Sequence, residues 1–311
     1  MAIPHRIDVH HHIAPPGYIA TLDPQGIRLA RETRGWSPAQ SIELMDEGGV
    51  ETALTSITTP GLWFGDPAAA RKLARLCNDY GAKLASDHPG RFGMFVNLPL
   101  PDIDGSLREI EYGLDVLKAD GVVLFTSYGD KWLGDPAFDP VFAELDRRRA
   151  VIYTHPTTAT CCTNIMPVLN DSVIEYGTDT TRTLTQMIVT GRAARFPNLR
   201  LIWSHGGGQM PFLIVRMIRL ARNPELARHM PQGFVQEARR FYYDTAAVYA
   251  AGPMLALRQV VPVERILYGT DVPWGNPAEI ADELAKCGVF DAAELAKIDR
   301  ENALQLFPRY G

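Results

Sequence analysis

The sequence predicts an α/β protein, specifically a (β/α)8 TIM barrel made by a single domain with an extended loop after the first strand. Short apolar, β-branched runs alternate with longer segments of helical spacing along all 311 residues. Each return crossing between parallel strands needs a helix, so this alternation favours parallel pairing, and eight units match a barrel. The predicted strands are Ile7–Ile13, Thr52–Ile57, Phe92–Leu98, Gly121–Thr126, Val151–His155, Leu199–His205, Phe241–Ala246 and Ile266–Asp271.

Helices are predicted between these strands. In the best defined one, apolar residues recur at spacings of three and four, which places them on one helical face: Leu73, Leu76, Cys77, Tyr80 and Leu84. Asp66 and Pro67 suit its N-terminus, as a capping side chain followed by proline in the first turn. Thr178, Asp179 and Thr180 are predicted as possible caps of a later helix that carries Leu184 and Ala194, and Asp291–Phe307 is predicted as the closing helix.

An open, doubly wound sheet is the structural alternative. That fold would need a glycine-rich phosphate turn after the first strand, where this chain has His10-His11-His12. Gly206-Gly207-Gly208 lacks the G-x-G-x-x-G spacing, which argues against dinucleotide binding. The segment Ala14–Ser37 is long for a barrel loop and rich in Pro and Gly, and we expect it to lie on the C-terminal face as a lid.

Composition excludes several classes of partner. Lys and Arg total 31 against 36 Asp and Glu, a net charge of −5, so nucleic acid is not the expected partner. No stretch approaches the roughly 18 apolar residues that a membrane span requires. The four cysteines include no Cys-x-x-Cys pair and are too few for a disulfide framework. The first 13 residues lack the apolar run of a signal peptide, so we expect a cytoplasmic protein.

The strongest local motif is Asp8-Val9-His10-His11-His12. Residues two apart in a strand share a face, so His10 and His12 point the same way, and two imidazoles at a strand end suit a divalent metal. Asp8 is expected to share this face, where it could orient one of these imidazoles. His11 faces the helices and is interpreted as structural, and His5 precedes the strand and receives no role.

Three further strands end in polar groups: His155, His205 and Asp271. In a barrel all of them open onto the C-terminal face, where active sites lie. The predicted metal ligands are His10, His12, His155 and Asp271, and His205 is left as the acid or base. The strand Gly121–Thr126 has no lysine that could bridge two metals, so we expect one ion. Such an ion binds anions or lowers the pKa of a bound water to about 7.

With these residues in place, the chain resembles the amidohydrolase superfamily, in the branch of aminocarboxymuconate-semialdehyde decarboxylase. That branch also holds γ-resorcylate, 5-carboxyvanillate and 6-methylsalicylate decarboxylases. The order and spacing of the motifs fit from about residue 5 to residue 308, and residues 1–311 are expected to form one such domain. The matching stretches are Asp8–His12, Thr154-His155-Pro156, Ser204–Gly208 and Gly269–Trp274, with weaker matches at Leu76-Cys77-Asn78 and Glu301-Asn302-Ala303.

The resemblance implies a mononuclear Zn or Mn site at the four predicted ligands, with His205 catalytic. It also implies that Arg216 meets the substrate carboxylate, in some members from a neighbouring subunit, so a homodimer or homotetramer is expected. Trp274 occupies the position where relatives pack an aromatic ring on the substrate. For Trp63 and Phe64, two roles remain open: lining the same pocket or simply packing. Ser41 lies near the position of a second substrate arginine in some relatives, so a monocarboxylated phenol fits better than a dicarboxylate.

The predicted function is therefore metal-dependent, non-oxidative decarboxylation of a hydroxylated, salicylate-like aromatic acid. His205 and Asp271 are both candidates for the proton donor. The alternative is a hydrolase that uses a metal-activated water on a lactone, amide or carbon–carbon bond. A metal-binding structural or regulatory protein is a third possibility, but it would give His205 no reason to accompany the ligands.

Overall fold

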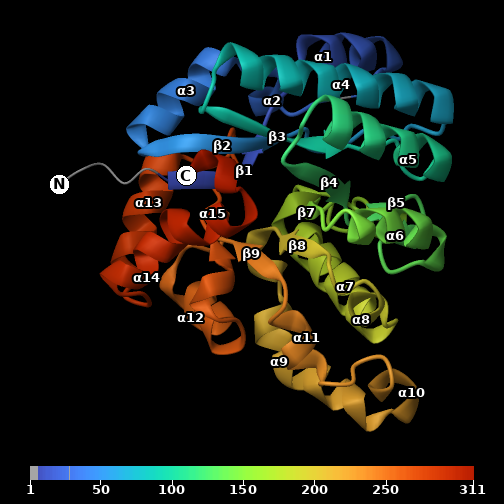
Figure 1. The fold of residues 1–311 in the computed structure, drawn as a ribbon, viewed down its shortest axis with the longest axis vertical. Helices are drawn as coiled ribbons and strands as arrows, with labels where there is room; N and C mark the ends of the chain where they lie inside the picture. Colours follow the sequence, from blue (N-terminus) through green and yellow to red (C-terminus); the bar gives the residue numbers. More distant parts are fainter. Residues whose placement is uncertain (1–5, 28) are drawn as a thin grey trace.

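The computed structural model describes residues 6–27 and 29–311, so His5 lies outside the described residues. Eight parallel strands stand side by side in the order in which they occur along the chain (Figure 1). They are β1 (Arg6–His12), β2 (Val50–Ser56), β3 (Phe92–Asn97), β4 (Gly121–Phe125), β7 (Val151–His155), β8 (Arg200–Trp203), β9 (Tyr242–Asp244) and β10 (Ile266–Leu267). A separate antiparallel hairpin joins β5 (Ser127–Tyr128) to β6 (Lys131–Trp132).

The segment from β10 onward closes the sheet against β1. The Val9 N–H donates to the Tyr268 carbonyl at 3.0 Å, and the Asp271 N–H donates to the His10 carbonyl at 2.8 Å. His11 and Val272 form one further parallel bridge. The first and last strands of an open doubly wound sheet do not meet in this way, so the predicted (β/α)8 barrel is confirmed.

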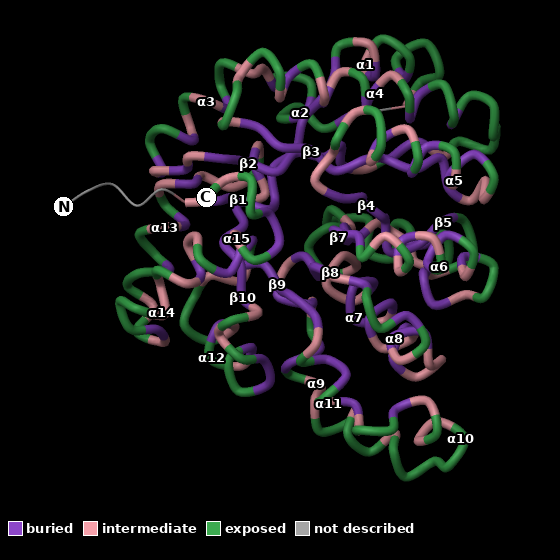
Figure 2. The backbone as a smooth tube through the Cα atoms, in the orientation of Figure 1, coloured by how far each residue is buried: buried purple, intermediate pink, exposed green. Residues whose placement is uncertain are grey.

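Helices surround the barrel in Figure 1, and Figure 2 shows the strands buried and the outer faces of the helices exposed. They are α1 (Pro16–Leu22), α2 (Arg31–Gly35), α3 (Pro38–Glu47), α4 (Pro67–Asp87), α5 (Ile103–Glu111), α6 (Asp139–Arg147), α7 (Glu175–Val189), α8 (Arg192–Arg195), α9 (Met210–Ile218), α10 (Pro224–Ala227), α11 (Phe234–Ala238), α12 (Ala251–Val260), α13 (Pro277–Lys286), α14 (Ala292–Ala296) and α15 (Asn302–Leu306). The predicted start of α4 is confirmed, since the Asp66 carboxylate accepts from the N–H groups of Ala68 and Ala69.

Two details of the helix predictions are wrong. Thr178, Asp179 and Thr180 lie inside α7 rather than at its start, because the helix begins at Glu175. The Asp179 carboxylate instead accepts hydrogen bonds from Thr126 and Trp132 on the neighbouring strand connection. Ala194 belongs to a separate short helix, α8, because the chain turns at Gly191, which has φ +78°.

The barrel interior is apolar at its N-terminal end and polar at its C-terminal end. Ile7, Val9, Phe95 and Tyr153 pack inside the lower barrel, and the C-terminal Leu306 and Phe307 close it from below. The polar side chains of these strands lie nearer to the C-terminal end of each strand. Because the apolar core fixes the strands, the side chains at and after their C-terminal ends are held in fixed positions.

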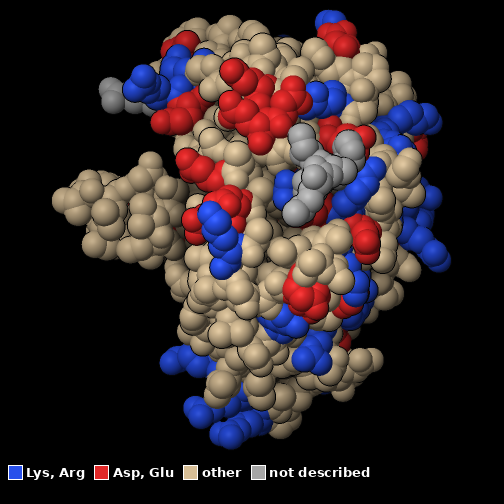
Figure 3. Space-filling model, turned by 90° about the vertical axis from the view of Figure 1, so that its left-hand side faces the viewer, with Lys and Arg blue, Asp and Glu red and all other residues tan. Residues whose placement is uncertain are grey.

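The outer surface differs between regions. Figure 3 shows Lys and Arg side chains gathered at the lower end of the molecule, where Figure 1 places α9 and α10. The exposed arginines of this region are Arg216, Arg219, Arg222 and Arg228. Within residues 6–27 and 29–311, no helix combines the length and apolar character needed to cross a bilayer.

Candidate metal centre and cavity

Four predicted ligands meet at the C-terminal end of the barrel. His10 and His12 come from β1, His155 ends β7, and Asp271 follows β10. One ligand atom from each lies within 4.8 Å of the others. The three imidazoles are buried, and the Asp271 side chain is 20% exposed. Residues spread over 262 positions of sequence therefore converge because parallel strands end on the same face of the barrel.

The ligand atoms lie close together around a common point, with His10 Nε2 3.0 Å from His12 Nε2. Asp271 Oδ1 lies 3.1 Å from His10 Nε2 and 3.2 Å from His12 Nε2. Yet this buried oxygen makes no hydrogen bond of acceptable geometry. Three imidazole nitrogens and one carboxylate around an unsatisfied centre are a donor set that a single divalent cation fits.

The electrostatics of the cluster also favour a cation. Burial lowers the pKa of His10, but the carboxylates of Asp271 and Asp244 outweigh burial and raise that pKa to about 10. Burial raises the pKa of Asp271, but the surrounding imidazoles, His10 foremost, hold it well below its usual range. Burial, with the neighbouring imidazoles, holds the pKa of His155 well below its usual value. Without a metal, the His10 imidazole therefore carries an extra proton between two carboxylates, and a divalent cation bound at this point takes the place of that proton.

The ring nitrogens that face away from the cluster each have a partner. His155 Nδ1 lies 2.8 Å from the Pro156 carbonyl, which only accepts, so Nδ1 carries the proton and Nε2 keeps its lone pair. His12 Nδ1 lies 3.3 Å from the Ser56 hydroxyl, and His10 Nδ1 lies 2.9 Å from Asp244 Oδ2. Such partners orient metal-binding imidazoles.

The prediction that Asp8 orients a ligand imidazole is wrong. Its carboxylate contacts the His11 ring at 3.2 Å and accepts from Thr270. The reason is a register irregularity in β1 between Asp8 and His11, which breaks the strict alternation of faces. His11, predicted to be structural, contacts Ser41 Oγ at 2.8 Å and lies behind the strand.

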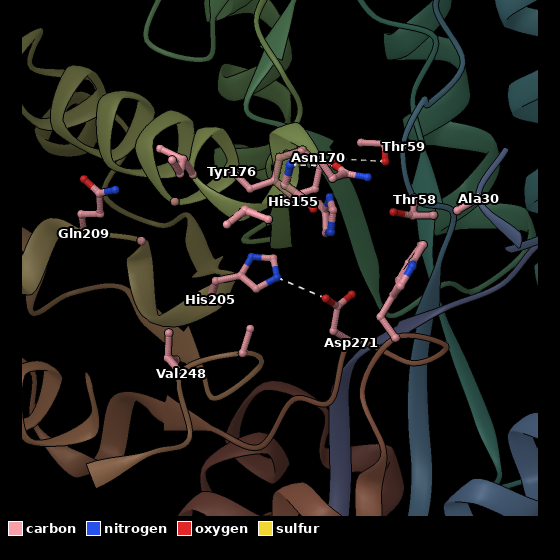
Figure 4. Close-up of a pocket in the computed structure, with 17 residues that line it drawn as sticks. Ala30, Thr58, Thr59, His155, Asn170, Tyr176, His205, Gln209, Val248 and Asp271 are labelled. Atoms are coloured by element: carbon pink, nitrogen blue, oxygen red, sulfur yellow. Dashed lines mark hydrogen bonds and ion pairs between the residues drawn. The ribbon is translucent and has the colours of Figure 1, made fainter. Parts of the chain in front are cut away.

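His205 stands beside the cluster. Its Nε2 lies 3.4 Å from Asp271 Oδ2, and Figure 4 shows the ring turned toward that carboxylate. His205 has φ +52°, a left-handed conformation that is rare outside glycine, and three glycines with positive φ follow it. The sharp turn at the end of β8 thus brings the imidazole over the barrel mouth.

A cavity of about 490 Å³ opens above His155, His205 and Asp271. Tyr176 lies in its wall, with its hydroxyl 2.9 Å from Thr59 Oγ1 and its ring 6.0 Å from that of His155 (Figure 4). The described residues that line the cavity include neither Lys nor Arg. They are Ala30, Thr58, Thr59, His155, Asn170, Ser172, Val173, Ile174, Tyr176, Gly177, His205, Gly208, Gln209, Ala247, Val248, Asp271 and Trp274.

This geometry can be compared with known proteins. The amidohydrolase family model matches residues 7–309, nearly the whole chain. This chain belongs to the amidohydrolase family. A decarboxylase of Aspergillus niger is 37% identical over 327 residues, covering 98% of this chain and 88% of the relative. The 6-methylsalicylic acid decarboxylase of Aspergillus aculeatus is 36% identical over 324 residues, covering 98% and 96%.

Solved structures agree on the fold of this amidohydrolase. A dihydroxybenzoic acid decarboxylase from Polaromonas sp. JS666, solved with manganese and the inhibitor 2-nitroresorcinol, superposes with a TM-score of 0.86. It is 21% identical, and the match covers 98% of this chain and 97% of that one. The predicted resemblance to the decarboxylase branch of the family is therefore confirmed, as is the predicted class of activity, carboxy-lyase.

The remaining predicted residues of the amidohydrolase fall in different places. Trp274 lines the cavity, and its ring lies 5.8 Å from that of His12. Arg216 does not line the cavity; it is exposed on α9. Trp63 lines a separate cavity of about 100 Å³, and Phe64 is 36% exposed, so neither residue, left open by the sequence, belongs to the larger cavity.

The segment Ala14–Ser37 is more ordered than the predicted loop. It contains α1 and α2. Helix α1 is held in place because Tyr18 and Leu22 pack against α4 and the Tyr18 hydroxyl donates to the Gly61 carbonyl at 2.8 Å. Of its described residues, Ala30 alone lines the cavity. The segment therefore contributes one wall position rather than a broad cover.

Sequence reasoning missed two residues of this site. Asp244 ends β9 and contacts His10, and Tyr176 reaches the cavity from the second residue of α7. Asp244 could have been found by the signal that identified His155, a polar residue at the end of an apolar strand. Tyr176 gave no such signal, because a tyrosine near a helix start is ordinary in sequence.

Proposed function

We propose that this protein is a metal-dependent, non-oxidative decarboxylase of a salicylate-like aromatic acid. One observation carries the proposal: two members of the four-residue ligand cluster, His155 and Asp271, line a cavity in which a further polar side chain, His205, lies 3.4 Å from Asp271. The decarboxylase names of relatives more than 30% identical to this chain support it.

The proposed ligands are His10, His12, His155 and Asp271, holding one zinc or manganese ion. Manganese in the Polaromonas decarboxylase structure supports the choice of a divalent ion of this kind. When bound, the ion supplies positive charge that attracts the substrate carboxylate and its ortho oxygen. The protein holds three neutral imidazole nitrogens and one carboxylate in the orientation that lets all four bind the same ion.

We propose that His205 delivers the proton. Asp271 has a pKa well below its usual range, held there by the imidazoles around it despite its burial, so it stays ionised at neutral pH. His205 Nε2 lies 3.4 Å from Oδ2 of this carboxylate, so its imidazole stands beside the proposed ligand at the cavity. The proton goes to the ring carbon that bears the carboxylate, the carbon–carbon bond breaks, and CO2 leaves as the ring regains aromaticity. The net reaction consumes one proton and the carboxylate and yields the phenol and CO2.

The proposed substrate carries one carboxylate. The cavity presents apolar side chains such as Val173, Ile174 and Val248 together with neutral polar groups, and its described lining includes no cation for a second acid group. Trp274 is proposed to pack on the substrate ring. The activity of the Aspergillus aculeatus relative on 6-methylsalicylic acid is consistent with a small alkyl substituent at the apolar wall.

We further propose that Arg216 meets the carboxylate from a second copy, in a homodimer or homotetramer. Phe212, Val215 and Ile218 on the same helix are 68%, 59% and 49% exposed, an apolar face that a second copy would bury.

The proposed domain spans residues 1–311. Cys77, Cys161, Cys162 and Cys287 are free thiols, which fits the proposed cytoplasmic location.

The test is to incubate the protein, loaded with Zn²⁺ or Mn²⁺, with salicylate and its hydroxy and methyl derivatives. Release of equal amounts of CO2 and the corresponding phenol is expected. Turnover of lactones or esters without CO2 release from any aromatic acid would instead support the hydrolase alternative and overturn this proposal.

A further inference from the structure

Asp244, at the end of β9, is fully buried between two functional histidines. Its Oδ2 lies 2.9 Å from His10 Nδ1 and accepts from the Tyr153 hydroxyl at 3.3 Å. Its Oδ1 accepts from the backbone N–H groups of His205 at 2.7 Å and Ala246 at 3.2 Å. The two oxygens thus have four partners, two on strands β1 and β7 and two in the turns that follow β8 and β9.

The backbone at Gly269, which follows β10, packs closely against Asp244 and His10. A Cβ added at Gly269 would lie 2.9 Å from the Cβ of Asp244 and 3.0 Å from that of His10, so the backbone of the last strand passes between the two residues at contact distance. In the described chain, no Lys or Arg forms an ion pair with Asp244. A buried carboxylate without a cationic side chain needs all of its hydrogen bonds, and these fix its orientation.

We propose that Asp244 is a positioning residue that sets two groups of the proposed decarboxylase at once: the tautomer of His10 and the backbone of His205. This inference rests on the proposed metal-dependent function. An ionised carboxylate only accepts, so His10 Nδ1 carries a proton, and a His10 ring that binds a metal through Nε2 has no second proton. The lone pair on Nε2 then faces the cluster, where His12 Nε2 and Asp271 Oδ1 lie 3.0 and 3.1 Å away.

The second half of the proposal concerns His205. This residue has φ +52°, a conformation that a side chain with a Cβ adopts at a cost. Its N–H donates to Asp244 Oδ1 at 2.7 Å, a short charge-assisted bond that holds the turn at the end of β8. The same carboxylate thus sets the direction from which the His205 imidazole approaches Asp271.

The test of the first half uses Asp244→Asn, with Tyr153→Phe as the matched control. The amide keeps an oxygen for the His205 N–H but turns its NH2 toward His10 Nδ1. His10 must then accept at Nδ1 and carry its proton on Nε2, the nitrogen that faces the cluster. We expect the affinity for Mn²⁺ alone, measured by chelator competition, to fall about 10–100-fold. Tyr153→Phe removes one bond to the same oxygen without changing the tautomer, so its affinity should stay within about threefold.

Affinity of Asp244→Asn within twofold of the unmodified protein would overturn the tautomer role. So would an equal loss in Tyr153→Phe. Long-range ¹H–¹⁵N NMR of the unmodified, Zn²⁺-loaded protein gives a readout that needs no folded variant. The His10 ring should be protonated at Nδ1, and a proton on Nε2 would refute the proposal.

The test of the second half compares Asp244→Ala with Asp244→Asn at saturating Mn²⁺. Of the two variants, only the amide of Asp244→Asn can still accept from the His205 N–H, so kcat of Asp244→Ala should be about 2–10-fold lower, the scale of one lost neutral hydrogen bond. Equal kcat values would remove His205 from the proposal. Mn²⁺ affinity and the His10 tautomer do not depend on the reaction, so a protein that binds Mn²⁺ yet releases no CO2 would refute the proposed function alone.

Discussion

His205 Nε2 and Asp271 Oδ2 face one another at 3.4 Å across the mouth of the barrel, and both residues have positive φ. His205 lies two residues after the end of β8, and Asp271 lies four residues after the end of β10. The left-handed backbone conformation at both residues directs their side chains toward the barrel mouth. Their contact links the proposed proton donor, His205, to a proposed metal ligand, Asp271.

His205→Gln should separate catalysis from metal binding. The amide cannot deliver a proton, so kcat for decarboxylation should fall by about 10²–10⁴-fold, the usual contribution of a general acid. His205 is not one of the four clustered ligands, so metal content by elemental analysis should stay at the unmodified level. Loss of the metal together with activity would show that His205 is a ligand instead.

His155→Ala should lower both metal content and rate. It removes one of three imidazoles from a closed cluster, so stoichiometry after dialysis should drop well below one ion per chain. His88→Ala is the matched control, because His88 lies just before β3 at the opposite end of the barrel. An unchanged metal content in His155→Ala would refute the ligand assignment.

Arg216→Ala should mainly weaken substrate binding. A lost charge-assisted hydrogen bond of about 1.5–3 kcal/mol corresponds to a KM about 10–150-fold higher, with metal content unchanged. Arg219→Ala, an exposed arginine three residues further along, is the control. The oligomer should also be visible by light scattering. A monomer with full activity would contradict the proposed contribution from a second copy.

Glu144→Gln should reduce stability in a pH-dependent way. Hydrogen bonds from Arg147, and then from Arg148, lower the pKa of Glu144 from 4.5 to about 2. A carboxyl whose pKa is lower in the folded state stabilises it above pH 4.5 and loses this contribution as the pH falls toward 2.

Because water screens this surface cluster, we expect a loss of only about 0.5–1 kcal/mol at pH 7 in urea unfolding. The difference between Glu144→Gln and the unmodified protein should shrink toward pH 3. Glu111→Gln, on an exposed carboxylate of α5, serves as the control. A difference that is constant from pH 7 to pH 3 would rule out the ion pairs as its cause.

The sequence predicted most of the barrel because each strand is an apolar run bounded by helical spacing. Seven of the eight predicted strands agree with the structure to within two residues at both ends. The exception is the run around β10, which extends four residues past Leu267 into the turn that carries Asp271. His155 and Asp271 were found because they interrupt apolar runs at the face where parallel strands end.

Other features were invisible for physical reasons. Asp8 was misplaced because the irregularity in β1 depends on its pairing with β2, which the alternation of one strand does not reveal. Asp244 ends an apolar run and so has a local signal, but its contact with His10 was not predictable because His10 lies 234 residues earlier in the chain. The helical content of Ala14–Ser37 arises from packing against α4 rather than from a local apolar repeat.

By itself, the sequence determined the order of strands and helices and the types of side chain at the strand ends, because periodicity and residue chemistry are local properties of the chain. Tertiary structure alone decided which nitrogen of each imidazole faces the cluster, that Asp244 rather than Asp8 contacts the His10 imidazole, and that Arg216 does not line the cavity of its own chain. These outcomes depend on contacts between segments far apart in sequence. Closing the barrel sets such contacts, and no local pattern encodes them.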